Sequence, residues 1–521
     1  MININENEYI VSLKDGVNYD QFWAEMETTT RGLPSIPDRS VDIVNERPGS
    51  LRSCHYSLSD GEAEALRLDP RVYSVEIPPS KRTDIAIKLR AAQESDFTKT
   101  TSDSGSYVNW GLRRCISSTN NYGTGITANG PYTYSLDGTG VDVVISDSGL
   151  QVDHPEFTNS NGGSRVVQIN WYTASGLPGT QSGNFYRDYD GHGTHVGGIA
   201  AGKTYGWAKN SQIYSMKING LEGAGDSGTG ISVTDCFDTI KLWHQNKPVD
   251  PKTGLKRPTV VNMSWGYVGV FSNITGGVYR GASWTGTTAQ SSYGMIGSSG
   301  NYGTRVGSVD VDIEEMISAG IVVVVAAGNY YQKIDIPSGL DYDNYFISSL
   351  FGNRYYNRGS SPYSQNGIIV GSIDSTVYDA NTEYKSVFSE SGPGVDIYAP
   401  GSNVMSCTSN TNKWGFGSQS YYLNSNFRQT NISGTSMASP QVAGLSALFL
   451  QMNPHATPAQ VKSWLISQST SVIYSTGLDN DYINARSIKG GNNRFMFNQF
   501  NSPTPVNIVG GLNFNNISFN S

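Results

Sequence analysis

Three segments of the chain place a carboxylate, an imidazole and a hydroxyl in conspicuous local settings. Asp147 follows an apolar run and precedes Ser-Gly, His192 lies between two glycines, and Ser436 follows Gly-Thr and precedes Met-Ala-Ser-Pro. His192 is one of only six histidines in the chain. A serine hydroxyl is a weak nucleophile at neutral pH, so it needs a base in contact and a third group that orients the base. These residue types are therefore the ones that hydrolysis by a serine nucleophile requires.

Each of these residues is expected at a junction between two elements. Val141–Ser146 predicts a buried strand, and an Asp at the C-terminal end of a parallel strand lies at the rim where α/β proteins bind ligands. Helices are expected to begin at His192 and next to Ser436. The N-terminal amides of a helix favour developing negative charge, and flanking glycines let backbone and substrate approach closely.

Taken alone, each segment also has an ordinary explanation. Asp147 could simply begin a turn, and Gly-Thr-Ser could be a helix cap. His192 and His195 could form a metal pair, but the Glu of an HExxH pattern and a third ligand are missing nearby. An esterase or lipase would need a Gly-x-Ser-x-Gly elbow and the order Ser, Asp, His, whereas the order here is Asp, His, Ser. An inactive protease fold kept for binding is the other alternative, and the presence of all three residues argues against it.

In combination, Asp-Ser-Gly, Gly-His-Gly-Thr-His-Val and Gly-Thr-Ser-Met-Ala-Ser-Pro closely resemble the motifs of the subtilase family of serine peptidases. The resemblance covers about residues 109–470 and is closest to the proteinase K branch. It implies that Ser436 is the nucleophile, His192 the general base and then acid, and Asp147 the residue that holds the imidazole. His195 resembles the family's second, non-catalytic histidine. The implied activity is that of a serine endopeptidase, which hydrolyses polypeptides through an acyl-enzyme.

Two further segments resemble the substrate-binding parts of subtilases. Ser264–Gly266 resembles the edge whose backbone pairs with an extended peptide, and Ala327–Asn329 resembles the segment whose asparagine donates to the oxyanion. The resemblance assigns Asn329 to the oxyanion. It assigns substrate binding to Ser264, Trp265, Gly266, Ala327 and Gly328. Trp265 stands where leucine is common, so we expect it to narrow the wall of the substrate pocket.

No cofactor is required for the implied chemistry, and structural calcium is a hypothesis. Asp396, in Val-Asp-Ile-Tyr-Ala-Pro-Gly, lies where proteinase K-like enzymes have a calcium aspartate, although an ordinary Asp at a strand end is an equal alternative. The loop of the tight calcium site of subtilisins is missing. The four cysteines form no CxxC pair, so buried free thiols are expected, with one or two disulfide bridges as the alternative.

Apolar runs that alternate with amphipathic stretches predict an α/β three-layer sandwich with a mainly parallel sheet, and the resemblance implies that this sheet is subtilisin-like. The expected strands are 141–146, 166–170, 212–218, 259–263, 321–326, 367–373 and 396–399. The expected helices are 192–201, 231–246, 309–319, 435–452 and 458–468. Segments 267–307 and 330–365 are rich in Gly, Ser, Tyr and Asn, and we expect long loop insertions there.

The N-terminal residues 1–79 predict a separate small α+β domain with the order β-α-β-β-α-β, a ferredoxin-like arrangement. Residues 80–108 read as an exposed linker, residues 109–470 as the catalytic domain and residues 471–521 as a C-terminal extension. The small domain resembles the inhibitory propeptides of subtilases. This implies a self-processing zymogen, with the propeptide as a partner of its own enzyme and cleavage between Ile77 and Val108.

The composition excludes several classes of partner. The net charge of −8 gives no general attraction to nucleic acid or to anionic membranes, and no apolar run is long enough to span a bilayer. The polar, acidic start lacks the features of a Sec signal peptide. These features suit export by another route or a peptidase carried by an assembly such as a phage virion; the N-terminal segment faintly resembles proteins of tailed marine phages.

Overall fold

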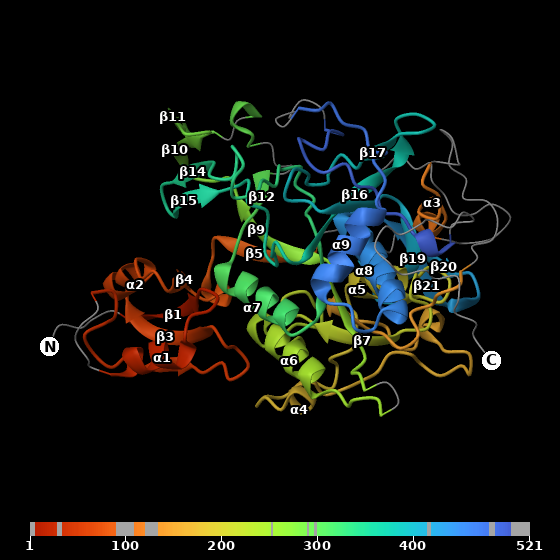
Figure 1. The fold of residues 1–521 in the computed structure, drawn as a ribbon, viewed down its shortest axis with the longest axis horizontal. Coiled ribbons are helices and arrows are strands. Elements are labelled where there is room, and N and C mark those ends of the chain that lie inside the picture. Colours follow the sequence, from red (N-terminus) through yellow and green to blue (C-terminus); the bar gives the residue numbers. More distant parts are fainter. Residues whose placement is uncertain are drawn as a thin grey trace.

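The computed structural model describes residues 6–28, 34–89, 109–119, 134–251, 254–288, 291–295, 300–413, 418–478 and 485–501. Its centre is a seven-stranded sheet with the order β17-β16-β13-β8-β6-β7, in which β18 also pairs with β16 (Figure 1). The strands are β6 (Asp142–Asp147), β7 (Gln212–Lys217), β8 (Thr259–Met263), β13 (Val322–Ala326), β16 (Ile368–Val377), β17 (Glu383–Lys385) and β18 (Ile397–Pro400). Only β17 pairs antiparallel; the other pairs in this sheet are parallel.

The sheet is covered on both faces. Its central strands are therefore apolar, and they are buried along their whole length. β13, for example, reads Val-Val-Val-Val-Ala and is fully buried, as parallel strands between two helical layers are. Helices α5 (His192–Ala201) and α8 (Thr435–Met452) pack together, and α6 (Val233–Asn246) packs on α7 (Gly307–Ser318). The predicted α/β three-layer fold is therefore confirmed.

One predicted strand of this domain is wrong. Residues 166–170 form only an isolated bridge between Val166 and Ile213. The short helix α4 (Trp171–Ser175) begins directly after them, because the Asn170 side chain accepts a hydrogen bond from the Thr173 amide at 3.0 Å and caps it.

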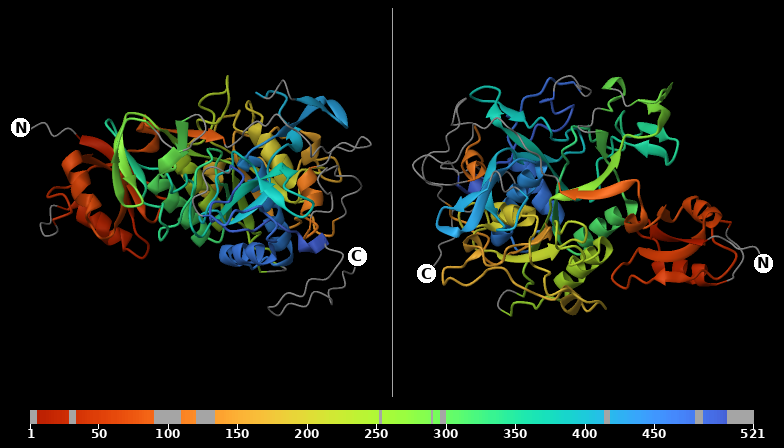
Figure 2. Two further views of the ribbon diagram at one scale, coloured as in Figure 1. Left: turned by 90° about the horizontal axis from the view of Figure 1, so that it is seen from above. Right: turned by 180° about the vertical axis from the view of Figure 1, so that it is seen from behind.

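The N-terminal unit, residues 6–76, has the predicted order β-α-β-β-α-β. It comprises β1 (Glu6–Leu13), α1 (Tyr19–Glu27), β2 (Ile43–Asn45), β3 (Ser53–Ser59), α2 (Asp60–Arg67) and β4 (Val72–Glu76). Its antiparallel sheet, β2-β3-β1-β4, encloses a hydrophobic core of its own. The unit stands at one end of the molecule and packs through β1 and β4 against α7 (Figures 1 and 2).

Part of the expected linker is structured. Residues 79–81 form a short 3-10 helix, and β5 (Ile85–Leu89) pairs antiparallel with β9 (Trp265–Val270), so the prediction of an exposed linker is wrong for this stretch. The sequence did not predict this strand, because its partner is about 180 residues away and no local hydrophobic periodicity marks it.

The two expected loop insertions also contain strands. β9 pairs with β12 (Asn301–Gly303), while β10 (Ile274–Tyr279), β11 (Ala282–Thr285), β14 (Tyr345–Ser348) and β15 (Gly352–Tyr355) form a sheet of order β11-β10-β14-β15. We call β9–β12 with β14 and β15 the insertion platform. It has a separate small core that includes Trp284, Tyr302 and Phe346.

The body of the domain continues past the boundary expected at residue 470. Phe495 forms bridges with Tyr398 and Thr470, and Ile473, Ile488 and Met496 join the main core. The remaining helices are α3 (Trp110–Arg114) and α9 (Pro458–Gln468). None of the helices in the described residues is long and apolar enough to cross a membrane. Residues 502–521 lie outside the described part of the chain.

Candidate active site

Asp147 and His192 meet at the C-terminal edge of the sheet. Asp147 ends β6, and His192 begins α5. The Nδ1 atom of His192 lies 2.8 Å from Oδ1 of Asp147, and both side chains are fully buried. Because a neutral imidazole that donates from Nδ1 has its lone pair on Nε2, this contact prepares Nε2 to accept a proton. Among the described residues, Nε2 has no hydrogen-bond partner.

Two glycines explain how His192 comes so close to Asp147. Gly191 has a φ of +91°, which favours glycine, and a Cβ there would lie 2.3 Å from Asn412 Cβ. A Cβ on Gly193 would lie 2.2 Å from the Gly149 carbonyl oxygen. The sequence Gly-His-Gly therefore lets the start of α5 press against the turn that follows β6.

Ser436 lies in the first turn of α8, after the turn of Gly434. Its Oγ donates a hydrogen bond to the Ser264 carbonyl oxygen at 3.0 Å, and Ser264 Oγ donates to the Ser436 carbonyl oxygen at 3.0 Å. Ser264 directly follows β8, which is the neighbour of β6 in the sheet. The hydroxyl is therefore held at the same edge as Asp147 and His192, with the N-terminal amides of α8 beside it.

Asn329 follows β13 at this edge. Its Oδ1 accepts hydrogen bonds from the amide and from the hydroxyl of Thr435, both at 2.9 Å. This fixes the plane of the side-chain amide and turns its NH₂ group, the donating end, away from Thr435. An amide fixed in this way can donate to a negatively charged oxygen near Ser436 without reorganising.

The segments expected to bind substrate lie on both sides of this edge. The backbones of Trp265 and Gly266 pair with Leu89 and Lys88 of β5, so this stretch does bind an extended chain, namely the protein's own. The Trp265 side chain is fully buried, stacks on Phe237 and donates from Nε1 to Ser146 Oγ at 3.4 Å. The expectation that it narrows a substrate wall is therefore wrong, because the ring belongs to the core.

Two buried carboxylates at this edge were missed by sequence reasoning. Asp188 accepts hydrogen bonds from Ser148, Asp190, Gly191 and Thr194, which ties the start of α5 to the turn after Asp147. Burial raises the pKa of Asp188 to about 6, although the bonds from Thr194 oppose this shift. Its place four residues before His192 was the available signal.

Glu390 is the second missed carboxylate, and it is completely buried. Its amide donates to the Gly328 carbonyl oxygen at 2.9 Å, and a Cβ on Gly328 would lie 2.6 Å from Glu390 Cδ. The carboxylate therefore packs against the segment that precedes Asn329. No local pattern pointed to it, because the two residues are about 60 positions apart.

Asp396 does not fit a calcium site. Its Oδ1 pairs with the Lys462 ammonium at 2.8 Å, and its Oδ2 accepts from the Ile369 amide at 2.9 Å. A lysine thus supplies the positive charge that the resemblance ascribed to calcium. The described residues contain no group of three or more His, Cys, Asp or Glu side chains that could hold a metal ion.

The remaining candidates have structural surroundings. His195 is buried, contacts the Thr430 carbonyl oxygen through Nε2 at 3.0 Å, and has a pKa that burial lowers to about 3. The prediction of free thiols is confirmed, since Cys54, Cys115, Cys236 and Cys407 are all buried and unpaired with one another.

Comparison with known proteins agrees with this architecture. Residues 138–490 match the model of the subtilase family, Peptidase S8. The extracellular serine proteinase of Thermus sp. is 28% identical over 86% of this chain and 79% of its own length. Proteinase R of Parengyodontium album is 28% identical over 86% of this chain and 80% of its own.

A solved structure shares the fold across nearly the whole chain. Fervidolysin from Fervidobacterium pennivorans, a keratinolytic enzyme related to subtilisin, aligns with a TM-score of 0.53 and 15% identity over 98% of this chain and 62% of its own. With the family match over more than half of the sequence, the chain belongs to the subtilase family of serine peptidases, whose members hydrolyse polypeptides.

Proposed function

We propose that this protein is a serine endopeptidase in which Asp147, His192 and Ser436 form the catalytic triad. The contact that carries the proposal is the 2.8 Å pairing of His192 Nδ1 with Asp147, which leaves Nε2 to serve the nucleophile. The Ser436 hydroxyl, bound to the Ser264 carbonyl in this structure, rotates by one rotamer step to donate to Nε2 when substrate binds.

The reaction then follows from these groups. His192 takes the Ser436 proton while Oγ attacks the peptide carbonyl carbon, and Asp147 stabilises the imidazolium. Asn329 and the Ser436 amide donate to the oxyanion. His192 protonates the leaving amine, the acyl-enzyme forms, and water attacks it with His192 again as base.

Labelling with a fluorophosphonate tests the nucleophile, because only an activated serine reacts. We expect one adduct, on Ser436, and none in the Ser436→Ala variant, which should also lose casein hydrolysis. Casein hydrolysis by Ser436→Ala protein at the wild-type rate would reject the assignment.

We further propose that the N-terminal unit is an inhibitory propeptide and that the chain is made as a zymogen. β5 lies on β9 as an extended peptide would and runs toward Ser436, ending opposite Trp265, the residue next to Ser264. We therefore propose that the scissile bond lies within the first few residues after Leu89. N-terminal sequencing of processed protein should give a start there; a start near Asn109 would contradict this placement.

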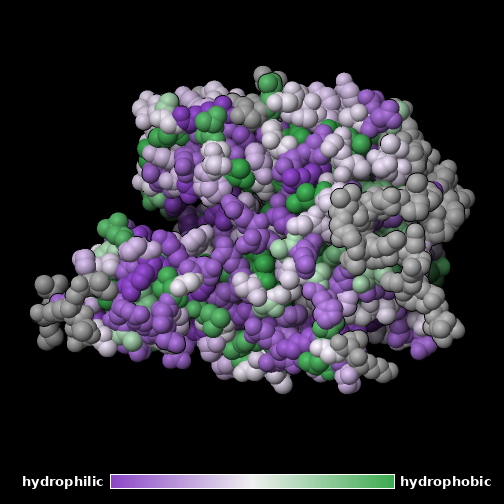
Figure 3. All heavy atoms as spheres, viewed as in Figure 1, coloured by the Kyte–Doolittle hydropathy of each residue, from purple (hydrophilic) through white to green (hydrophobic). Residues whose placement is uncertain are grey.

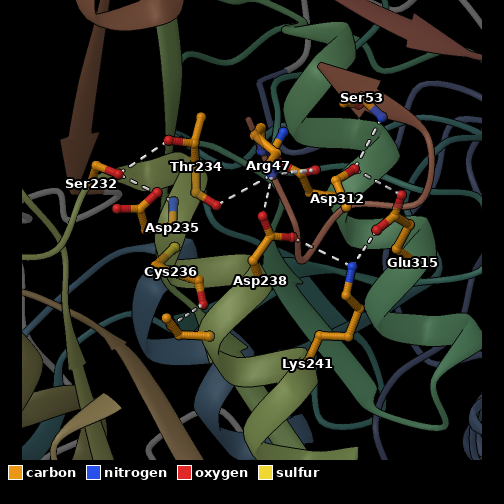
Figure 4. A network of polar contacts seen from close by, with 12 residues as sticks. Arg47, Ser53, Ser232, Thr234, Asp235, Cys236, Asp238, Lys241, Asp312 and Glu315 are labelled. Carbon is orange, nitrogen blue, oxygen red and sulfur yellow. Dashed lines mark hydrogen bonds and ion pairs between the residues drawn. The ribbon is translucent and has the colours of Figure 1, made fainter. Parts of the chain in front are cut away.

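The N-terminal unit is held by a buried charge network (Figure 4). Arg47, between β2 and β3, donates to Asp238 of α6 at 3.0 Å and to Asp312 of α7 at 2.9 Å. Ser50 donates to Glu315 at 3.1 Å, and Lys241 pairs with the same carboxylate. Burial raises the pKa of Asp312, and the positive charge of Arg47 opposes that shift. At the end of the interface, Glu76 accepts from the Gly307 and Ser308 amides that begin α7.

Arg47→Ala tests this inhibitory role. Removing one partner of a buried ion pair costs about 3–5 kcal/mol, so we expect the cleaved unit to dissociate about 10²-fold to 10⁴-fold faster, with an earlier onset of activity. Arg39→Ala is the matched control, because Arg39 pairs with Glu62 inside the unit and is 27% exposed. Equal onset times in the two variants would show that the network does not hold the inhibitor.

We propose that the enzyme acts outside the cell that makes it, as the extracellular serine proteinase of Thermus sp. does by its name. Association with a particle such as a virion is the more specific hypothesis from the sequence. Fractionation decides between them: activity in spent medium and none in purified particles would remove the virion hypothesis.

A further inference from the structure

The insertion platform lengthens the edge on which a peptide can pair. β9 continues past Gly266 to Val270, and β5 pairs along it from Leu89 opposite Trp265 to Ile85 opposite Gly269. β12 pairs with the opposite edge of β9, so β9 is the middle strand of this small sheet. A chain that lies where β5 lies therefore reaches the platform as it extends away from Ser436.

The platform is a packed body, so side chains on it have fixed positions. The Phe271 ring lies 4.8 Å from that of Tyr302, and the Tyr302 ring meets that of Phe346 edge-on at 5.5 Å. Tyr302 and Phe346 are both buried. Since these rings come from both insertions, their packing joins the two insertions into one unit.

A small pocket lies where the segment before β5 crosses the platform. It has a volume of about 140 Å³ and is lined by Thr83 and Asp84 on one side and by Val270, Tyr302, Phe346 and Arg354 on the other. Figure 3 shows the surface hollowed between the N-terminal unit, at lower left, and the platform, at upper left, with mostly hydrophilic residues around the recess.

Arg354, on β15, provides the charge in this pocket. It donates to Asp84 Oδ2 at 2.9 Å, and its guanidinium lies 5.4 Å from the centre of the Phe351 ring. Asp84 also accepts from Arg82 at 3.0 and 2.7 Å. Burial tends to raise the pKa of Asp84, but the bonds and charges of Arg82 and Arg354 lower it, so the group is a carboxylate.

Arg82 and Arg354 are separated when the chain is cut after β5. Arg82 leaves with the N-terminal segment, whereas Arg354 stays with the enzyme. Its side chain is 24% exposed even with Asp84 in place, so removal of that segment uncovers the guanidinium beside an aromatic pocket. A carboxylate on another extended chain can take the place of Asp84 there.

We propose that Arg354 forms a distal substrate subsite that selects an acidic residue about six positions before the scissile bond. The proposal rests on the proposed peptidase function and deepens it by naming a feature of the preferred substrate. An extended polypeptide with Asp or Glu at that distance pairs with β9 and places its carboxylate on Arg354.

Two synthetic peptides test the proposal, since the register of this segment on β9 is known. One has the sequence of residues 80–95 with Arg82→Gln, which leaves Arg354 as the guanidinium for Asp84; the other carries Asp84→Asn as well. For the processed wild-type enzyme, we expect kcat/KM for the first peptide to exceed that for the second by about threefold to tenfold. Equal values would overturn the proposal.

Variants of the enzyme assign the effect to Arg354. Arg354→Gln should bring the ratio close to one, Arg354→Lys should keep most of it, and Arg354→Glu should reverse it. Arg358→Gln is the matched control, because Arg358 lies on the same insertion, pairs with Asp343 and does not line the pocket; it should keep the wild-type ratio. An unchanged ratio in Arg354→Gln would overturn the inference. Failure of the proposed peptidase function is distinct, since neither peptide would then be cut.

Discussion

Most residues of the catalytic edge could be recognised in the sequence, whereas the strands of the insertion platform could not. The catalytic edge, residues 147, 188, 192, 264, 329 and 436, lies where strands of one mainly parallel sheet end and where α5 and α8 begin, with 188 and 329 in the adjoining loops. The platform consists of strands from two insertions, where Ile274 pairs with Ser348 across more than 70 residues. The first is fixed by short local motifs; the second depends on partners that no local pattern reveals.

The difference indicates that the catalytic groups and the proposed distal subsite lie in separately packed parts of the molecule. The core of the α/β sheet and the core of the platform are distinct clusters of buried side chains. They are joined through β9, which starts beside Ser264 and ends in the platform. Changes at the catalytic edge should therefore alter turnover, and changes in the platform should alter which long substrates are preferred.

The largest expected effect is that of Asp147→Asn. The amide reverses the hydrogen bond to His192 Nδ1 and favours the wrong tautomer, so kcat should fall by about 10⁴-fold. The measurement is hydrolysis of a short chromogenic peptide by the processed variant, whose zymogen is cleaved by immobilised wild-type protease that is removed before the assay.

The control for Asp147→Asn concerns the platform. Hydrogen exchange of β10 and β14 should match that of the wild type, because neither strand contacts Asp147. Altered exchange in those strands would show that the catalytic edge and the platform are not independent.

Elements of the two regions also differ in how well they could be predicted from the sequence. α5, α8 and α9 were predicted with the observed bounds, since the Gly-His-Gly and Gly-Thr-Ser motifs mark the starts of α5 and α8 and Thr457 caps α9. β5 was taken for linker and β10–β12, β14 and β15 for loops, because Gly, Ser, Tyr and Asn fit a strand only when a partner strand is present. The buried side chain of Trp265 and the Lys462 partner of Asp396 were equally out of reach, since both depend on residues distant in the chain.

A smaller effect is expected of Glu390→Gln. Glu390 packs its buried carboxylate against Gly328, in the segment that the resemblance assigns to substrate binding. The residue that follows β5 in the sequence, at the proposed cleavage site, is Arg90. A buried carboxylate favours a cationic side chain, so we expect cleavage after Arg or Lys to exceed cleavage after Leu. In the variant, kcat/KM for the Arg peptide should fall by about tenfold to hundredfold, and the Leu peptide should change far less. An equal fall for both peptides would place Glu390 outside substrate selection.

The smallest effect on turnover should come from Phe346→Ala. Phe346 is 1% exposed and contacts Phe271 and Tyr302, and loss of such a ring costs about 3–5 kcal/mol, more than a core this small can tolerate. It lies on β14, near Val270 at the end of β9 that is farther from Ser264, so the paired edge near Ser264 should persist. We expect faster hydrogen exchange in β10 and β14, loss of the preference for Asp84 peptides, and turnover of a short chromogenic peptide within about twofold of the wild type.

Leu350→Ala is the matched control, because Leu350 is 68% exposed on the same insertion and should change none of these. If Phe346→Ala instead reduced short-peptide turnover as strongly as Asp147→Asn does, the platform would be part of the catalytic edge, and the two regions would form one cooperative unit through β9.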